Sequence, residues 1–213
     1  GLKLQCQQTG GDGCVFYDVT LSDTRGKDRA ITLVYSVPVA RDGLRWFHNP
    51  RQTQSITANR EYMNTSRFAR LGATGRLSRY PLGCVGNSQQ GVALGIDMDR
   101  PAFYRIGYNE ATGELFLAYD IGLTPEQPTA QVRFCRFLFD DHHEFRGALD
   151  QYYKIFPEAF QCRTPEQGLW MPFAKISQVD HFEDFGFKFK EGDNETAWDD
   201  AHGIITFRYT EPM

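Results

Sequence analysis

The hydrophobic pattern of this chain changes its period once, and that change constrains the fold more than any other feature. From residue 1 to about residue 140, apolar residues alternate with polar ones, as they do along half-buried strands. Between Glu144 and Phe160 they recur about every 3.6 positions, as on one face of a helix. The pattern therefore predicts a β-domain over 1–140 and a linker helix with its connection over 141–167.

The alternating runs are separated by turn residues such as Asp99-Arg100-Pro101. Pro38 falls within the third run and predicts an edge position or the end of that strand, because proline cannot donate to a ladder. Runs at this spacing favour a mainly β fold, a large antiparallel β-sandwich or super-sandwich. The predicted strands are 2–6, 15–21, 31–39, 80–85, 91–98, 102–108, 115–121 and 131–139.

Residues 41–80 interrupt this series, and we interpret them as a long ordered loop with short strands. Arginines alternate there with aromatic residues, an arrangement that suits packing against acidic segments or contact with an anionic polysaccharide. The net charge of the chain is −4, so a general nucleic-acid-binding face is not expected. The residues concerned are Arg45, Trp46, Phe47, His48, Arg51, Arg67, Arg70, Arg76 and Arg79.

The composition further limits the classes of molecule that the chain is expected to bind. Aromatic residues make up 14% of the chain, which indicates a β-rich core or platforms on which sugar rings stack. No apolar run approaches the ~18 residues of a membrane helix, so no membrane partner is expected. No cofactor and no metal site are predicted, because the acidic and histidine runs at 140–144 and 199–202 are better explained by helix capping and charge pairing.

The last segment, 168–213, has a different hydrophobic pattern. Gly168-Leu169-Trp170-Met171-Pro172-Phe173 is typical of a short buried strand, and 174–195 is irregular. A helical turn over 196–202 ends at Gly203, and 204–210 forms a second buried strand. This order of strand, connection with a helix and strand predicts a βα-type beginning, and the strand-like sequence at both ends of the chain predicts a fragment of a longer protein.

The sequences Ala148-Leu149-Asp150-Gln151-Tyr152-Tyr153-Lys154-Ile155-Phe156-Pro157 and Gly168-Leu169-Trp170-Met171-Pro172 carry a resemblance. Together with the run 23–30 before a long strand, they resemble large bacterial glycoside hydrolases, such as the α-glucosidase and α-galactosidase groups. In those proteins a galactose-mutarotase-like β-super-sandwich precedes a (β/α)8 barrel, so the resemblance implies that 168–213 is the truncated opening βα segment of such a barrel.

The resemblance implies an N-terminal, non-catalytic part of a glycoside hydrolase, which packs on the catalytic barrel and shapes it. The alternative is a stand-alone carbohydrate-binding or protein-interaction module. The implied partner is an oligo- or polysaccharide, and the location is secreted or periplasmic if the parent protein degrades polysaccharides. No catalytic pair of those families is matched, so catalysis by this chain alone is not expected.

Three residues are the candidate substrate contacts. Trp170 offers an aromatic face to a sugar ring, and Glu211 follows the last predicted strand at the end where barrel active sites gather. Asp184 belongs to the acidic and aromatic stretch 180–187, which suits a loop covering a sugar site. We expect Trp170 and Glu211 to lie on neighbouring strands and to share one pocket. The catalytic residues themselves remain unassigned.

The five cysteines carry less information, because their number is odd and no pair has a zinc-ligand spacing. Cys6 and Cys14 flank a Gly-rich turn, so a hairpin could bring their thiols together. Most of the five are expected to be small, buried apolar residues.

Overall fold

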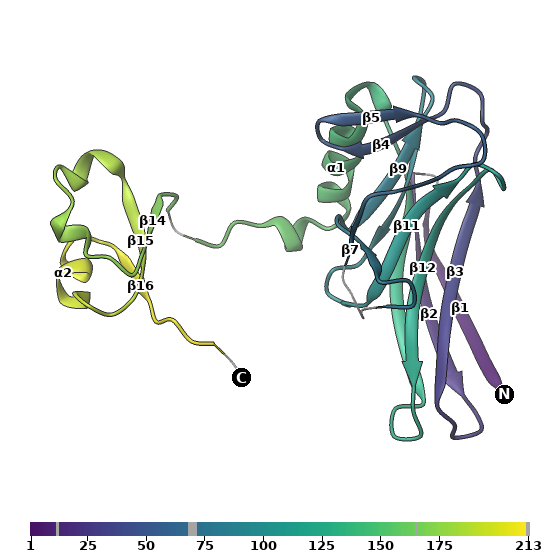
Figure 1. Cartoon of the computed structure of the whole chain (residues 1–213), viewed down its shortest axis with the longest axis horizontal. Coiled ribbons are helices and arrows are strands. Elements are labelled where there is room, and N and C mark those ends of the chain that lie inside the picture. Colours follow the sequence, from purple (N-terminus) through teal and green to yellow (C-terminus); the bar gives the residue numbers. More distant parts are fainter. Residues whose placement is uncertain (12, 68–71, 165, 212–213) are drawn as a thin grey trace. The chain divides into compact units, whose positions relative to one another are not determined.

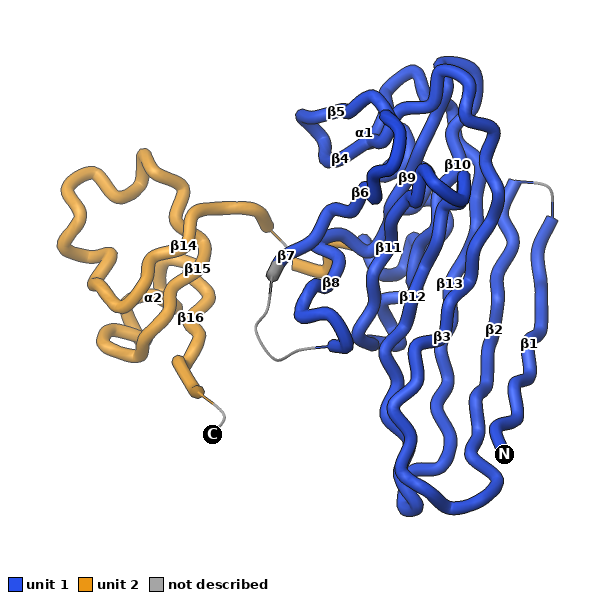
Figure 2. Tube along the Cα trace, turned by 45° about the vertical axis from the view of Figure 1, so that its right-hand side comes forward, with its two compact units in different colours: residues 1–160 blue, residues 161–213 orange. Residues whose placement is uncertain are grey.

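A computed structural model describes residues 1–11, 13–67, 72–164 and 166–211. The chain divides into two compact units, Gly1–Phe160 and Gln161–Met213 (Figure 2). The first unit is mainly β and contains the strands of the sandwich. The second contains a small parallel sheet. Each unit is described by itself.

A large sheet forms the middle layer of the first unit. Within the described residues it has seven strands, all paired antiparallel, in the order β1-β2-β13-β10-β9-β4-β5 (Figure 1). Its strands are β1 (Leu2–Gly11), β2 (Cys14–Asp23), β4 (Arg45–Asn49), β5 (Gln52–Ser55), β9 (Leu82–Gly86), β10 (Gly91–Ile96) and β13 (Thr129–Phe139).

A smaller sheet packs against one face of the large one. In the part of the chain that the structure describes it has four antiparallel strands in the order β3-β12-β11-β6. They are β3 (Arg29–Pro38), β12 (Glu114–Leu123), β11 (Phe103–Asn109) and β6 (Glu61–Met63). The predicted mainly β architecture with antiparallel sheets is confirmed. β3 lies at an edge of its sheet and ends at Pro38, as the proline indicated.

The core between the two sheets is made by the inward half of each alternating pattern. Tyr17 of β2 and Tyr35 of β3 face each other across it, with their ring centroids 4.7 Å apart and their hydroxyls 2.8 Å apart. Leu115 and Leu117 of β12 are fully buried in the same cluster. Because successive side chains of a strand point to opposite faces, Glu114 and Phe116 lie on the outer face.

A helix covers the other face of the large sheet. α1 (Glu144–Ile155) buries Phe145, Ala148 and Tyr152 against that sheet, and the Tyr152 hydroxyl donates to the carbonyl of Ile96 at 2.6 Å. Tyr153, on the same helix, is exposed. Short 3₁₀ turns at Asp141–His143 and Pro157–Phe160 flank the helix.

The segment 41–80 is more regular than the sequence indicated. Besides β4, β5 and β6 it contains a hairpin of β7 (Thr65–Arg67) and β8 (Arg76–Ser78). Arg45 pairs with Glu144 at 2.7 Å, so one of the local arginines does contact the acidic linker. Arg70 and the side chain of Arg67 lie outside the described part of the chain.

The second unit is a parallel sheet of β14 (Leu169–Pro172), β15 (Phe187–Glu191) and β16 (Ile205–Phe207), in that order across its described residues. α2 (Thr196–Ala201) connects β15 to β16, and 3₁₀ turns at Ile176–Gln178 and Phe182–Phe185 precede β15. The interpretation of 174–195 as irregular was wrong, because β15 lies within it. β15 was missed because Lys188, Lys190 and Glu191 mask its alternation.

The first hairpin keeps Cys6 and Cys14 apart, which corrects the expected pairing. Cys6 stands opposite Val19 and Cys14 opposite Gly11, so the two cysteines lie far from each other along the ladder. All five cysteines are free thiols.

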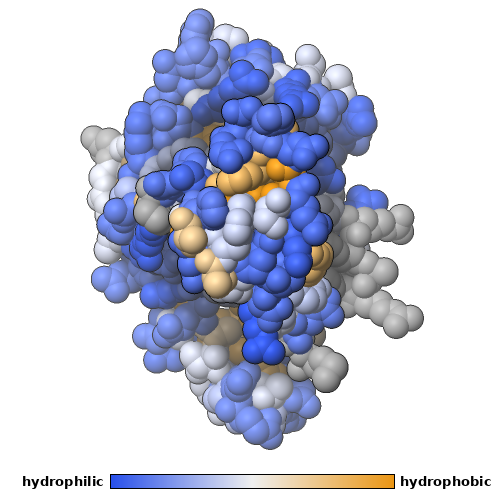
Figure 3. All heavy atoms as spheres, turned by 90° about the vertical axis from the view of Figure 1, so that its left-hand side faces the viewer, coloured by the Kyte–Doolittle hydropathy of each residue, from blue (hydrophilic) through white to orange (hydrophobic). Residues whose placement is uncertain are grey.

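The surface seen in Figure 3 is mostly hydrophilic, with a few small apolar patches. No helix in the described ranges is long and apolar enough to cross a membrane.

Candidate functional site

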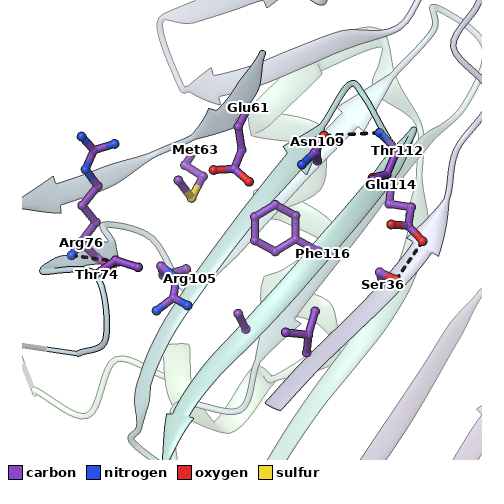
Figure 4. Close-up of a pocket in the computed structure, with 12 residues that line it drawn as sticks. Ser36, Glu61, Met63, Thr74, Arg76, Arg105, Asn109, Thr112, Glu114 and Phe116 are labelled. Carbon is purple, nitrogen blue, oxygen red and sulfur yellow. Dashed lines mark hydrogen bonds between the residues drawn. The ribbon is translucent and has the colours of Figure 1, made fainter. Parts of the chain in front are cut away.

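A groove of about 450 Å³ lies on the outer face of the four-stranded sheet (Figure 4). The sheet forms its floor, and β6 and the turn before β8 form one of its walls. The residues that line it are Val34, Ser36, Glu61, Met63, Thr74, Arg76, Arg105, Asn109, Thr112, Glu114, Phe116 and Ala118. None of these residues except Arg76 was singled out from the sequence.

The floor of the groove is built around one aromatic ring. Phe116 stands opposite Gly107 on the neighbouring strand, and Met63 stands opposite Gly107 on the other side. A Cβ atom at residue 107 would lie 2.5 Å from Met63 Cγ and 2.9 Å from Phe116 Cζ. The glycine therefore makes the space in which the Phe116 ring rests on the sheet, and the ring has a fixed position.

The wall beside β8 is tied to the floor through Asp120. The carboxylate accepts from the Arg105 guanidinium at 2.5 Å and from the backbone N–H of Ala73 at 2.6 Å. Burial alone would raise the pKa of Asp120, but the Ala73 N–H and the Arg105 cation outweigh it and hold this pKa below its ordinary value. Gly72 approaches the same carboxylate with φ +64°, a conformation that favours glycine. The pairing neutralises Arg105 and fixes the turn against the sheet.

The rim of the groove offers hydrogen-bonding groups around the ring. Figure 4 shows Phe116 between Glu61 and Met63 on one side and Glu114 on the other. Glu114 accepts from the Ser36 hydroxyl at 3.0 Å, and Asn109 accepts from the Thr112 N–H at 3.3 Å. Among the described residues Arg76 makes no ion pair and is exposed. An apolar ring surrounded by hydrogen-bond acceptors and donors can hold a ligand with an apolar face and polar edges.

The acidic and histidine runs have structural partners. Asp140 caps the turn at Asp141–His143, and the buried Asp141 accepts from the Ser88 N–H at 2.7 Å. In the second run, Asp199 pairs with Lys190, and a ring nitrogen of His202 lies 2.8 Å from the Trp198 carbonyl. No group of three or more metal-ligating side chains gathers anywhere in the described residues.

The second unit holds the three residues expected to contact substrate. Trp170 lies on β14 and is 54% exposed. Glu211 follows the carboxyl end of β16, where it accepts from the Tyr209 hydroxyl. Asp184 is exposed in the turn that leads into the amino end of β15, so it lies at the opposite edge of the sheet from Glu211.

The expected neighbouring strands for Trp170 and Glu211 are not neighbours. β15 lies between β14 and β16, and it pairs Phe189 with Trp170 on one side and with Ile205 on the other. The expectation that the two residues lie on adjacent strands was therefore wrong. Trp170, Phe189 and Ile205 share one face of the sheet, because paired residues of neighbouring strands point the same way.

The two faces of this parallel sheet differ sharply. On the face toward α2, Lys190 is fully buried and pairs with the buried Asp199 at 2.8 Å, and Thr206 donates to the same carboxylate. On the other face Trp170, Ile205 and Phe207 are each more than 40% exposed. Within the described part of this unit, nothing covers that apolar face.

No protein-family model matches the chain, and no curated protein matches its sequence. Among solved structures, the chain is similar to the Slr1438 protein from Synechocystis sp. PCC 6803, with a TM-score of 0.40 and 5% identity over 64% of this chain and 54% of that one. It is also similar to the ligand-free alpha-N-acetylgalactosaminidase NagBb from Bifidobacterium bifidum, with a TM-score of 0.39 and 10% identity. That alignment covers 80% of this chain and 35% of the other.

The chain therefore spans about half the length of the first of these proteins and about a third of the second. Both scores are low, so neither likeness assigns this chain a fold family or an activity. The function has to be argued from the groove and from the two sheets.

Proposed function

We propose that the first unit is a carbohydrate-binding β-sandwich and that its groove over Phe116 holds a neutral oligosaccharide. The observation that carries the proposal is the fixed aromatic ring with Glu61, Asn109 and Glu114 around it and Arg76 at the edge of the groove. A pyranose ring has an apolar C–H face and a rim of hydroxyls. The C–H face packs on an aromatic ring, and carboxylate, amide and guanidinium groups bind the hydroxyls.

The charges of the groove favour a neutral ligand over an anionic one. Arg105 is paired with Asp120, so Arg76 is the cation left to face a ligand, against the carboxylates of Glu61 and Glu114. An anionic polysaccharide or a nucleic acid needs a positive surface, because phosphates and uronates are bound by lysine and arginine. This balance of charges in the groove favours a ligand that is bound through its hydroxyl groups.

The test is a calorimetric titration of the chain with a panel of neutral oligosaccharides. Phe116→Ala should weaken binding at least about tenfold, which is about 1.4 kcal/mol. Phe103→Ala is the matched control, because Phe103 is 48% exposed on the same face of the same sheet and does not line the groove. No binding by the wild-type chain, or an equal loss in both variants, would contradict the proposal.

A second role is favoured by the apolar face of the second unit. We propose that this unit is the opening βα segment of a barrel and that the chain is the non-catalytic, N-terminal part of a glycoside-hydrolase-like protein. Parallel sheets are usually covered on both faces. Here Trp170, Ile205 and Phe207 are exposed on one face. Closure into a barrel would bury that face.

In this proposal Trp170 and Glu211 contact the substrate only once further βα units complete the barrel, with Glu211 beyond the carboxyl end of β16 and Trp170 on β14. Asp184 does not contact it, because it lies at the amino ends of the strands. The coding sequence downstream of Met213 is the test. Further βα units are expected there, and a stop codon would contradict this second role while leaving the sugar-binding proposal intact.

A further inference from the structure

The two sheets of the first unit are offset on one side, so that the larger sheet projects beyond the smaller one. β2 lies across from β3, as the contact between Tyr17 and Tyr35 establishes. β1 pairs with β2 on the far side, and β3 is the last strand of its own sheet. β1 therefore overhangs β3 by one strand, and Figure 2 shows it at the rim of the unit.

The overhang has an apolar inner face. Leu4 stands opposite Leu21 and Cys6 opposite Val19, and both of these partners belong to the core between the sheets. Paired residues share a face, so Leu2, Leu4 and Cys6 point toward the layer that β3 occupies. With no strand across from them, Leu2 is 50% and Leu4 57% exposed.

The overhanging β1 and the edge strand β3 form a step between the two sheets. Two free strand edges border this step. All ten residues of β1 are exposed, and its pairing with β2 is regular from Leu2 to Gly11. Natural edge strands are usually blunted by prolines, charges or bulges. β1 contains no proline and a single charged residue, Lys3, which points to the opposite face from Leu4. The free edge of β3 runs beside the overhang, so each of the two edges offers unpaired backbone groups to an incoming strand.

We propose that this step binds a second copy of the chain. A two-fold axis along the strand direction places the partner's β1 in the layer of the smaller sheet, next to β3, and places β1 next to the partner's β3. The step is self-complementary, because one overhang fills the space left by the other. Each copy contributes the ten residues of β1 and the ten of β3, close to the roughly 20–30 residues a side of a stable interface.

This arrangement is favoured over a plain edge-to-edge pairing of two β1 strands. Edge-to-edge pairing would leave Leu2, Leu4 and Cys6 exposed, whereas the interlocked form buries both rows of these residues against each other. Rotation about an axis along the strands keeps each residue at its own height, so Cys6 faces its counterpart across the axis.

Analytical ultracentrifugation of the whole chain tests the proposal. The wild type is expected to be a concentration-dependent dimer. Leu4→Asp should weaken the dimer at least about tenfold, since it buries an unpaired carboxylate. Gln5→Asp is the matched control on the opposite face of β1 and should leave the dimer intact. Circular dichroism checks that both variants stay folded, as expected for exposed positions.

A second measurement uses Cys6 in a Cys162→Ser background, which removes the other exposed thiol. A short bis-maleimide crosslinker should link two chains, because facing sheets lie about 10 Å apart, and adding Cys6→Ser should abolish the link. A wild-type chain that is monomeric at every concentration would overturn the proposal. A dimer weakened equally by Leu4→Asp and Gln5→Asp would overturn the interlocked form, since both faces of β1 would then be equivalent.

Discussion

The two sheets that carry the candidate residues differ in which side chains lie on their two faces. The four-stranded sheet of the first unit has an apolar inner face in the core and an outer face on which charged groups surround one ring. The parallel sheet of the second unit has an ion pair under α2 and an uncovered aromatic face. The outer face of the antiparallel sheet therefore forms a groove to which a ligand can bind, whereas one apolar face of the parallel sheet is exposed within the described part of its own unit. This comparison is why we assign sugar binding to the first unit.

The largest expected effect tests whether the second unit folds independently of the sandwich. Lys190→Ala leaves Asp199 buried without its cation, which should destabilise this unit by about 3–5 kcal/mol. Hydrogen exchange should rise in β15 and β16 and stay unchanged in β12 and β13. The double variant Lys190→Met/Asp199→Leu should recover part of the loss, because an apolar pair can replace a buried ion pair, while Glu195, which also pairs with Lys190 at 3.1 Å, still loses its cation. Equal exchange gains in both units would contradict the division.

A smaller effect tests whether Gly107 holds the Phe116 ring in place on the outer face of the sandwich. Gly107→Ala places a methyl group 2.8 Å from the Tyr62 carbonyl oxygen and against the Phe116 ring, so it should destabilise the fold by about 1–3 kcal/mol. It should weaken sugar binding as well, because it displaces Phe116.

Gly122→Ala is the control for that variant. Gly122 lies on β12 of the same sheet, and a Cβ atom there meets nothing within 4 Å. Thermal melting and titration should leave this variant at wild-type values. Similar losses in both variants would mean that the space above Gly107 has no special role.

The smallest effect concerns acid stability of the sandwich. The Lys27 N–H lowers the pKa of Asp23 to about 2, burial opposes this, and the Arg25 N–H and the Arg29 side chain add to the lowering. The resulting stability is present above the unfolded pKa of about 3.9 and is lost as the pH falls through about 2. Asp23→Asn should flatten the dependence of unfolding free energy on pH between these values. An unchanged slope in urea titrations would contradict this role.

The alternation of apolar residues predicted much of the sandwich. It located the eight longer runs that became β1, β2, β3 and β9 to β13, and Pro38 indicated the edge at β3. The shorter strands β4 to β8 could not be bounded, because three to five residues carry too few alternations to define a period.

The candidate groove could not be predicted, because its residues meet only through sheet register. Glu61 is far in the sequence from Arg105 and Phe116, and β11 pairs with the strands of both Glu61 and Phe116. One signal was present: Phe116 is a large apolar residue at an outward position, between the buried Leu115 and Leu117. In the second unit, β15 escaped notice because the buried Lys190 breaks the apolar pattern that predicts a strand.

The most direct test is chemical-shift mapping of the isotope-labelled chain during titration with a neutral oligosaccharide. The account predicts that the amides of Gly107, Asn109 and Phe116 shift in a saturable way, and that the Trp170 indole and the amides of β16 do not. Saturable shifts at Trp170 with none around Phe116 would contradict it, since the sugar would then bind the parallel sheet and not the groove.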